Sequence, residues 1–284
     1  MTGEATAGTH ALWTSRGTFG VRSAGPPDGV PVLLLHGFPD VAETFTGLQA
    51  ALAAVGRRSV ALTLRGYAPS PLVGPYGLAD VAADVAGVVE ALGSGPVDLV
   101  GHDFGGQVAW AVLQRSPGLV RRAVVLAAPH PASIAANARR SPAQWWRSRY
   151  IVGFQVPGLA EWRVRRHDFR YVERLWQRWS GPGWQARPDH LRRVREVLRD
   201  SMPAPVAMYR AGGFALPRTP VDVPVLSVLG RADGCVLPAM ADGERGLVTA
   251  EHRSVVLDEV GHWPHLEAPG DVAELVLAWL GQPG

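Results

Sequence analysis

The chain has 284 residues, of which 28 are basic, 25 are acidic and one is a cysteine. A chain of this length can bury one large core, and a single cysteine excludes an internal disulfide bond. No run of about 18 apolar residues is present that could span a bilayer, and residues 1–30 lack the basic start and apolar run of a signal peptide. We therefore expect a cytoplasmic protein without a membrane segment. The sequence also contains no nucleic-acid-binding motif and no Cys/His spacing typical of a zinc site.

Short apolar runs bounded by Gly, Pro or Asp alternate with longer segments that have helical spacing. Nearly continuous apolar strands are typical of a parallel sheet with both faces covered by helices. An antiparallel hairpin is predicted first, at 12–14 and 19–24. Six buried strands are predicted after it, at 31–36, 59–64, 97–103, 123–128, 224–230 and 254–260, and four helices accompany them, at 43–55, 78–92, 105–116 and 271–280. The sequence therefore predicts an α/β protein with a mostly parallel eight-stranded sheet flanked by helices.

The composition changes sharply after the sixth predicted strand. Between residues 129 and 219 there are 17 Arg and 6 acidic residues, a net charge of +11, whereas the rest of the chain carries −8. The same segment holds six of the ten Trp residues and has helical patterning. We therefore predict a helical unit at 129–217, inserted between two parts of one core domain at 1–128 and 218–284. Its basic charge could attract an anionic substrate, or could be a solvated surface of an arginine-biased chain.

The segment from Gly101 to Gly105, with the sequence Gly-His-Asp-Phe-Gly, follows a predicted strand and opens a predicted helix. This is the context of a nucleophile elbow, whose tight turn needs small residues two before and two after the nucleophile. The nucleophile position holds Asp103, a carboxylate that is already ionised near neutral pH. A carboxylate suits attack on saturated carbon, which leaves an alkyl ester on the enzyme. The alternative is that Asp103 only caps the helix.

Two further residues complete a candidate catalytic triad. His262 follows the last predicted strand, where it can reach the elbow and activate the water that hydrolyses an ester. Asp233 follows the strand at 224–230 and can orient His262. The chain order of nucleophile, acid and base is the order expected for such a fold. We interpret His265 as structural or surface-exposed and Cys235 as a small packing residue.

The loop after the strand at 31–36 is predicted to supply one backbone N–H of an oxyanion hole, and the residue after the nucleophile is predicted to supply the other. This assigns the two N–H groups to Phe38 and Phe104, whose side chains are expected to line the cavity. The Phe38–Pro39 peptide bond is a candidate for the cis form.

Five stretches of the chain resemble the epoxide hydrolase branch of the α/β-hydrolase superfamily. They lie at 36–39, 65–67, 101–106, 230–233 and 261–263, and the resemblance runs from about His10 to Leu280. It implies an α/β-hydrolase fold with a helical cap inserted after the sixth strand. In that family two cap tyrosines hold the epoxide oxygen, and the matching positions here are Tyr150 and Tyr209, with Tyr171 as a fallback.

The remaining expectations concern the substrate and its surroundings. We expect His36, Phe154 and Trp263 to line the substrate cavity. The reaction implied is conversion of an epoxide and water to a vicinal diol, through an ester on Asp103. No metal or organic cofactor is expected, nor is a nucleic-acid or membrane partner, and the protein is expected to be a monomer or a homodimer.

Two other functions stay open at this point. The first is a haloalkane or haloacid dehalogenase, which would use the same triad. Haloalkane dehalogenases typically have Trp after the nucleophile, where this chain has Phe104, and fluoroacetate dehalogenases carry arginines there and a cap His-Trp pair. The second is a non-catalytic ligand-binding protein on a hydrolase fold, against which an intact triad argues.

Overall fold

The computed structural model describes residues 9–211 and 216–282. Eight strands form one sheet in the order β1-β2-β4-β3-β5-β6-β7-β8. β2 runs antiparallel to both of its neighbours, and β3 to β8 are all parallel. The predicted fold class is therefore confirmed. The strands are β1 (Thr9–Thr14), β2 (Gly17–Ala24), β3 (Val32–Leu35), β4 (Ser59–Leu62), β5 (Val97–His102), β6 (Val120–Leu126), β7 (Val225–Gly230) and β8 (His252–Leu257).

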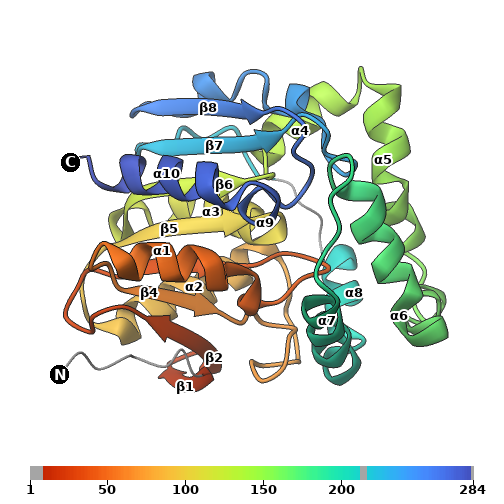
Figure 1. Ribbon diagram of the computed structural model, residues 1–284, viewed down its shortest axis with the longest axis horizontal. Helices are drawn as coiled ribbons and strands as arrows, with labels where there is room; N and C mark the ends of the chain where they lie inside the picture. Colours follow the sequence, from red (N-terminus) through yellow and green to blue (C-terminus); the bar gives the residue numbers. More distant parts are fainter. Residues whose placement is uncertain (1–8, 212–215, 283–284) are drawn as a thin grey trace.

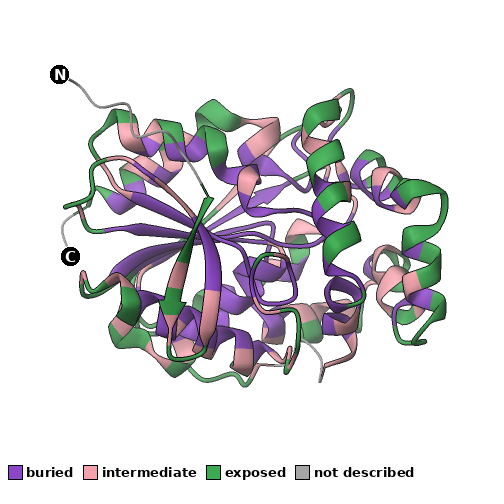
Figure 2. Cartoon of the chain, turned by 90° about the horizontal axis from the view of Figure 1, so that it is seen from below, coloured by how far each residue is buried: buried purple, intermediate pink, exposed green. Residues whose placement is uncertain are grey.

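Helices cover both faces of the sheet. α1 (Thr46–Ala54) and α10 (Pro269–Leu280) lie in front of the strands in Figure 1, and α2 (Leu78–Leu92) and α3 (Phe104–Arg115) lie behind them. Because side chains alternate along a strand, Val32 and Leu34 enter the core with α1 and α10, whereas Leu33 enters the core with α2 and α3. Both layers bury apolar surface, which explains the nearly continuous apolar strands (Figure 2).

The segment between β6 and β7 is helical and lies at the carboxyl ends of the parallel strands (Figure 1). We call residues 131–210 the helical insertion. It contains α4 (Pro131–Ala138), α5 (Pro142–Gly153), α6 (Leu159–Trp179), α7 (Pro188–Ser201) and α8 (Ala204–Ala207). A further short helix, α9 (Pro264–Glu267), and five 3₁₀ turns complete the secondary structure: η1 (Ala42–Phe45), η2 (Pro117–Leu119), η3 (Met208–Arg210), η4 (Pro238–Ala241) and η5 (Glu244–Leu247).

α6 consists of two helical segments. His167, Asp168 and Phe169 have φ values of 54°, 52° and 60°. This left-handed turn is one that residues with a side chain rarely adopt in succession, and its apolar member, Phe169, is buried. In the described part of the chain no helix is long and apolar enough to cross a bilayer.

The second half of α6 is fixed to the sheet domain. The indole of Trp176 stacks on Trp263 with ring centroids 3.7 Å apart, and its Nε1–H donates to the carbonyl of Pro39 at 2.9 Å. The N–H of His262 donates to the carbonyl of Trp179 at 2.9 Å. These contacts join the insertion to the loop that carries His262.

Candidate active site

Asp103 sits in the sharp turn between β5 and α3, with φ 50° and ψ −118°. The turn is tight enough to exclude side chains at its glycines. A Cβ atom on Gly101 would lie 2.5 Å from the carbonyl oxygen of Gly105, and one on Gly105 would lie 2.2 Å from that of Leu35. Both distances are far below van der Waals contact, so glycine is required at both positions. The turn places Asp103 at the N-terminus of α3, where the helix dipole favours a negative charge.

The carboxylate of Asp103 is held through both of its oxygen atoms. Oδ1 accepts the backbone N–H of Phe38 at 2.9 Å, and Oδ2 lies 3.2 Å from Nε2 of His262. Gly37 leaves room for this arrangement, because a Cβ there would lie 2.4 Å from Oδ1. The peptide bond after Phe38 is cis. Oδ1 thus lies at the backbone N–H that the sequence predicts as an oxyanion donor, and Oδ2 is the oxygen that faces His262.

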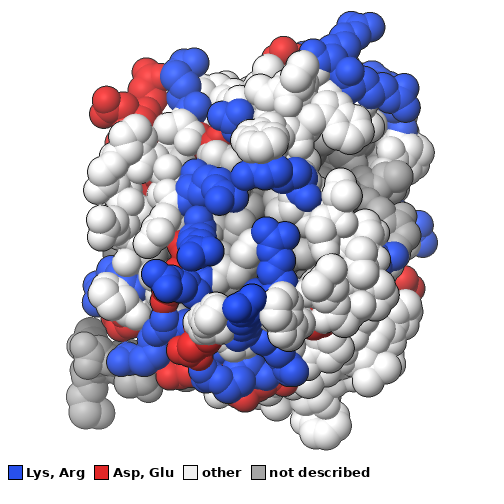
Figure 3. All heavy atoms as spheres, turned by 90° about the vertical axis from the view of Figure 1, so that its right-hand side faces the viewer, with Lys and Arg blue, Asp and Glu red and all other residues white. Residues whose placement is uncertain are grey.

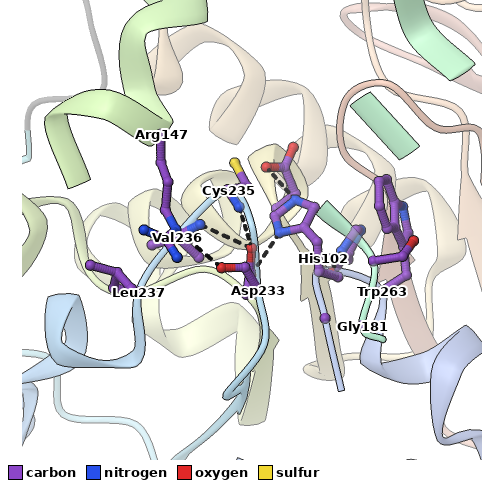
Figure 4. A network of polar contacts seen from close by, with 12 residues as sticks. His102, Arg147, Gly181, Asp233, Cys235, Val236, Leu237 and Trp263 are labelled. Atoms are coloured by element: carbon purple, nitrogen blue, oxygen red, sulfur yellow. Dashed lines mark hydrogen bonds and ion pairs between the residues drawn. The ribbon is translucent and has the colours of Figure 1, made fainter. Parts of the chain in front are cut away.

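Asp233 orients His262 from the opposite side of the imidazole ring. The Nδ1–H of His262 donates to Oδ2 of Asp233 at 2.8 Å, and both side chains are 1% exposed. Oδ1 of Asp233 accepts the N–H groups of Cys235 and Val236 at 2.6 Å and 3.0 Å, as Figure 4 shows. The hydrogen bond to Asp233 fixes the proton of His262 on Nδ1 when the ring is neutral, which leaves Nε2 free to accept a proton.

The charges of the three residues are coupled. Burial disfavours the protonated form of His262, but the carboxylates of Asp233 and Asp103 outweigh it and raise the pKa of His262 to about 10. Burial likewise opposes ionisation of Asp103, but the hydrogen bond and charge of His262 lower the pKa of Asp103 below its ordinary value. At neutral pH the resting site is therefore an ion pair between the Asp103 carboxylate and the His262 imidazolium.

His102, which belongs to the predicted elbow, makes a hydrogen bond to the backbone of His262. Its Nε2–H donates to the backbone carbonyl of His262 at 2.7 Å (His102 is labelled in Figure 4). Burial, followed by the charge of His262, lowers the pKa of His102 to about 4, so this ring is neutral. The sequence draws attention to His102, because it is adjacent to Asp103. It does not reveal the contact with His262, because the two residues are 160 positions apart in the chain.

A cavity of about 120 Å³ opens above the triad. Its walls come from both the sheet domain and the insertion, and Tyr150 and Tyr209 are among them. Burial raises the pKa of each tyrosine well above its ordinary value, and the Asp103 charge raises it further. Both hydroxyls are therefore protonated donors. The lining residues are Asp103, Phe104, Gln107, Ala127, Pro129, Ile134, Gln144, Ser148, Tyr150, Ile151, Tyr209, Cys235, Val236 and His262.

The structure corrects the expected lining of the cavity, since His36, Phe154 and Trp263 are absent from its walls. His36 is fully buried and accepts the N–H of Leu64 at Nε2. Trp263 is also fully buried, beneath Trp176. Phe154 packs edge-on behind Tyr150 and Tyr209, with centroids 5.6 Å and 5.2 Å away. The sequence places these three rings close to the motifs of the site. It does not show which of them are covered by other side chains and so kept out of the cavity.

The side chain of Phe38, which was expected in the lining, packs on Phe154 and Tyr209 instead, whereas Phe104 does line the cavity. Tyr171 is not part of this lining, and Tyr150 and Tyr209 are. His265 is buried, with Nε2 2.7 Å from the hydroxyl of Thr44. Cys235 is buried beside the Tyr150 hydroxyl, with Sγ 3.7 Å from it.

Two glutamines in the lining were missed by the sequence interpretation. Gln144, on α5, donates to the carbonyl of Cys235 and accepts the N–H of Leu237, both at 2.9 Å. It thereby ties the insertion to the loop that carries Asp233. Gln107 lies one helical turn after Asp103 and donates to the carbonyl of Pro129 at 3.0 Å. The spacing of Gln107 from the nucleophile could have identified it, whereas nothing local marks Gln144.

Two groups of side chains have metal-ligand spacing within the described residues. One is Asp103, Cys235 and His262, and the other is Asp40, His102 and His265. In the first group burial raises the pKa of the Cys235 thiol well above its ordinary value, and a protonated thiol is a poor ligand. In the second group Oδ1 of Asp40 is already paired with His190 at 2.8 Å. Neither donor set favours a metal over the contacts it already makes.

Comparison with known proteins agrees with the observed fold. The family model described as alpha/beta hydrolase fold matches residues 30–269. The chain is 30% identical over 260 residues to epoxide hydrolase 4 of Mus musculus, covering 88% of this chain and 72% of that protein. It is 27% identical over 271 residues to the AB hydrolase superfamily protein YfhM of Bacillus subtilis, covering 93% of this chain and 94% of that protein. The crystal structure of Bacillus megaterium epoxide hydrolase in complex with an inhibitor has the same fold, with a TM-score of 0.86 at 23% identity over 96% of this chain and 100% of that chain.

The ion pair at the elbow makes a prediction about the His262 pKa. Replacing Asp103 by Asn removes one of the two carboxylates that keep the imidazole protonated, so the pKa of His262 should fall by at least about one unit. An NMR pH titration of imidazole resonances, with His262 assigned from a His262→Gln spectrum, measures this shift. The exposed Asp258→Asn serves as the control and should leave the pKa unchanged. An unshifted His262 in Asp103→Asn would contradict the coupling.

Proposed function

Because the chain belongs to the epoxide hydrolase family of the α/β-hydrolase superfamily, we propose that it converts an epoxide to a vicinal diol through an alkyl ester on Asp103. One observation carries this proposal: the carboxylate of Asp103 and the buried phenols of Tyr150 and Tyr209 line a single cavity. A nucleophile thus faces two proton donors across the space that a substrate would fill. In this proposal residues 129–217, which include the helical insertion, act as a cap, and residues 1–128 and 218–284 form the core domain.

Ring opening uses the ionised carboxylate and the two phenols. Oδ2 of Asp103 attacks one ring carbon, and the bond from that carbon to the epoxide oxygen breaks. The alkoxide charge that develops is stabilised by the hydroxyls of Tyr150 and Tyr209, and one of them gives up its proton to form the hydroxyl group. The products of this step are a β-hydroxyalkyl ester and a tyrosinate.

Ester formation then converts His262 into a base. The ester has no charge, so one of the two carboxylates that raise the pKa of His262 is lost. The imidazolium passes its proton to the tyrosinate, and the neutral ring, held by Asp233, takes a proton from water. That water attacks the carbonyl carbon of the ester, and the oxyanion forms on Oδ1, where the N–H of Phe38 already donates. The second donor is the N–H of Phe104. Collapse releases the diol, which takes the proton from His262, and the carboxylic acid of Asp103 then protonates His262 again.

A substrate panel tests the proposed function against the dehalogenase alternative. A halide leaving group needs N–H donors. The described cavity lining contains no tryptophan, and the side-chain amides of Gln107 and Gln144 already donate to backbone carbonyls. The panel is styrene oxide, a terminal alkyl epoxide, a haloalkane and fluoroacetate. We expect diol from at least one epoxide and no halide release from the other two. Halide release without diol formation would replace the proposal by a dehalogenase, and no turnover of any of the four would favour a binding protein.

The base assignment predicts a trapped intermediate. His262→Gln retains the nucleophile but cannot deprotonate water, so ester formation should continue while hydrolysis falls by at least about 100-fold. Intact-protein mass spectrometry after incubation with an epoxide should show the added mass of one substrate, located on Asp103 by peptide mapping. The exposed His10→Gln should turn over normally and show no adduct. Normal turnover by His262→Gln would remove His262 from the mechanism.

The proposed role of the two cap tyrosines predicts that their removal slows formation of the ester, the step before hydrolysis. Changing both Tyr150 and Tyr209 to Phe keeps the aromatic packing but removes both donors, so formation of the ester should fall by at least about 1,000-fold. Tyr76→Phe is the control, because the Tyr76 hydroxyl bonds to the carbonyl of Leu72 outside the cavity. Single-turnover alkylation, followed by quenched-flow mass spectrometry, measures the step directly. Wild-type alkylation in the double variant would overturn the role of the tyrosines.

A further inference from the structure

A second pocket lies on the helical insertion, between α5 and α6, with a volume of about 270 Å³. Five of the nine residues that line it are arginines, and none is acidic. Figure 3 looks onto this side of the molecule, where arginine atoms far outnumber acidic ones. We call it the arginine pocket. Its lining residues are Arg147, Arg149, Tyr150, Arg163, Tyr171, Arg174, Leu175, Arg178 and Trp179.

The five arginines have no counter-charge of their own. Elsewhere on the insertion arginines pair with acidic residues, as Arg195 does with Glu173 and Arg210 with Glu161. Within the described residues no ion pair involves an arginine of the pocket. Arg174 and Arg178 are also one helical turn apart, a spacing at which like charges destabilise a helix. The chain therefore maintains a concentration of positive charge that a bound anion would neutralise.

Aromatic rings hold some of these guanidinium groups in place. The Arg163 guanidinium lies 4.8 Å from the centre of the Tyr171 ring, and that of Arg149 lies 4.0 Å from Trp146. Burial raises the pKa of Tyr171, and the nearby charges of Arg163, Arg178 and Arg149 partly offset that rise. A guanidinium that stacks on a ring still presents N–H groups at its edge, where they can bind an oxyanion, although Nη1 of Arg149 already donates to the backbone carbonyl of Trp146.

The arginine pocket adjoins the active-site cavity. Tyr150 lines both of them. Trp179, also in the arginine pocket, packs on Tyr150 with centroids 5.0 Å apart and on the catalytic His262 at 5.2 Å. Arg147 donates to the backbone carbonyl of Asp233 at 3.3 Å, and Figure 4 shows the Arg147 side chain beside Asp233. An anion in this pocket would therefore be separated from the triad by a single layer of aromatic side chains, that of Tyr150 and Trp179.

We propose that the arginine pocket is a recognition site for an anionic group, a carboxylate or a phosphate, carried by the epoxide substrate. This inference rests on the proposed function and narrows its substrate class to anionic epoxides. Arginine forks bind carboxylate and phosphate oxygens in pairs, and a pocket lined by one sign of charge also raises the local concentration of a substrate of the opposite sign. A neutral epoxide uses the same triad but gains nothing from the five arginines.

A pair of substrates that differ only in charge tests the proposal. The anionic member is 4-(oxiran-2-yl)benzoate and the neutral member is 4-(oxiran-2-yl)benzamide. A third substrate, the phenyl phosphate analogue of the benzoate, shows whether the pocket prefers a phosphate or a carboxylate. The ratio of kcat/KM for anionic over neutral substrate is measured at about 20 mM and about 500 mM salt, because salt screens such charges. The variant is Arg174→Gln/Arg178→Gln. The matched control is Arg115→Gln/Arg253→Gln, which removes two exposed arginines of the sheet domain that lie outside the pocket.

We expect a wild-type ratio of about 10 or more at low salt, within the range that electrostatic focusing produces. The ratio should fall towards 1 at high salt and in the pocket variant, and should persist in the control, while the neutral substrate changes less than twofold. A wild-type ratio near or below 1, or an unchanged ratio in the pocket variant, would overturn the arginine pocket and leave the proposed function intact.

If neither epoxide is hydrolysed, the proposed function fails and the pocket is still tested by binding. Isothermal titration with 4-(1,2-dihydroxyethyl)benzoate, the diol of the anionic substrate, gives its Kd for the wild type and the two double variants. Binding that weakens at least fivefold in the pocket variant alone supports an anion site, and equal or absent binding in all three proteins excludes one.

Discussion

The main-chain turn at Asp103 is the constraint on which the rest of the active site depends. Its φ of 50° is a conformation that costs a residue with a side chain about 1–3 kcal/mol, so the surrounding structure must hold it there. β5 enters the turn from the buried centre of the sheet and α3 leaves it, while Gly101 and Gly105 allow the backbone to approach neighbouring carbonyl groups. With the turn in this position, Oδ1 meets the N–H of Phe38 and Oδ2 meets His262.

In the proposed mechanism, the ion pair made at this turn explains how a single histidine can serve both stages of the cycle. In the resting site the Asp103 charge keeps His262 protonated, and His262 in turn keeps Asp103 ionised. The nucleophile is therefore available without a base. Conversion of the carboxylate to an ester removes that charge at the moment when a neutral imidazole is needed, while Asp233 keeps the ring in position throughout. The proposed chemistry thus follows from electrostatics that the resting structure already contains.

The sequence predicts those parts of the fold that local patterns determine. The buried strands and the glycines of the elbow are visible because continuous apolar runs and small residues at fixed spacing are local properties, and the eight-stranded sheet followed from them. The order of Asp103, Asp233 and His262 along the chain was informative for the same reason, and the structure brings the three side chains together. Other parts of the cavity wall could not be predicted in this way, although Phe104, Tyr150 and Tyr209 do line the cavity as expected. Trp263 is adjacent to His262 but is covered by Trp176, and Gln144 reaches the Asp233 loop from a separate helix. Both facts depend on how the insertion docks, which no local pattern encodes.

The way the insertion docks also separates its two proposed roles, which are holding the His262 loop and presenting the arginine pocket to a substrate. The end of α6 is bound to the sheet domain through Trp176 and Trp179, directly beside His262, so this half of the insertion is part of the catalytic framework. The arginines lie on surfaces of α5 and α6 that make no such contacts with the triad, apart from the backbone bond of Arg147. Substitution of the other four arginines would change the charge presented to a substrate without removing that hydrogen bond to Asp233. If the two proposals hold, substrate choice by the arginine pocket and ester chemistry at the triad can change separately. Tyr150, which lines both cavities, is the residue at which the two are coupled.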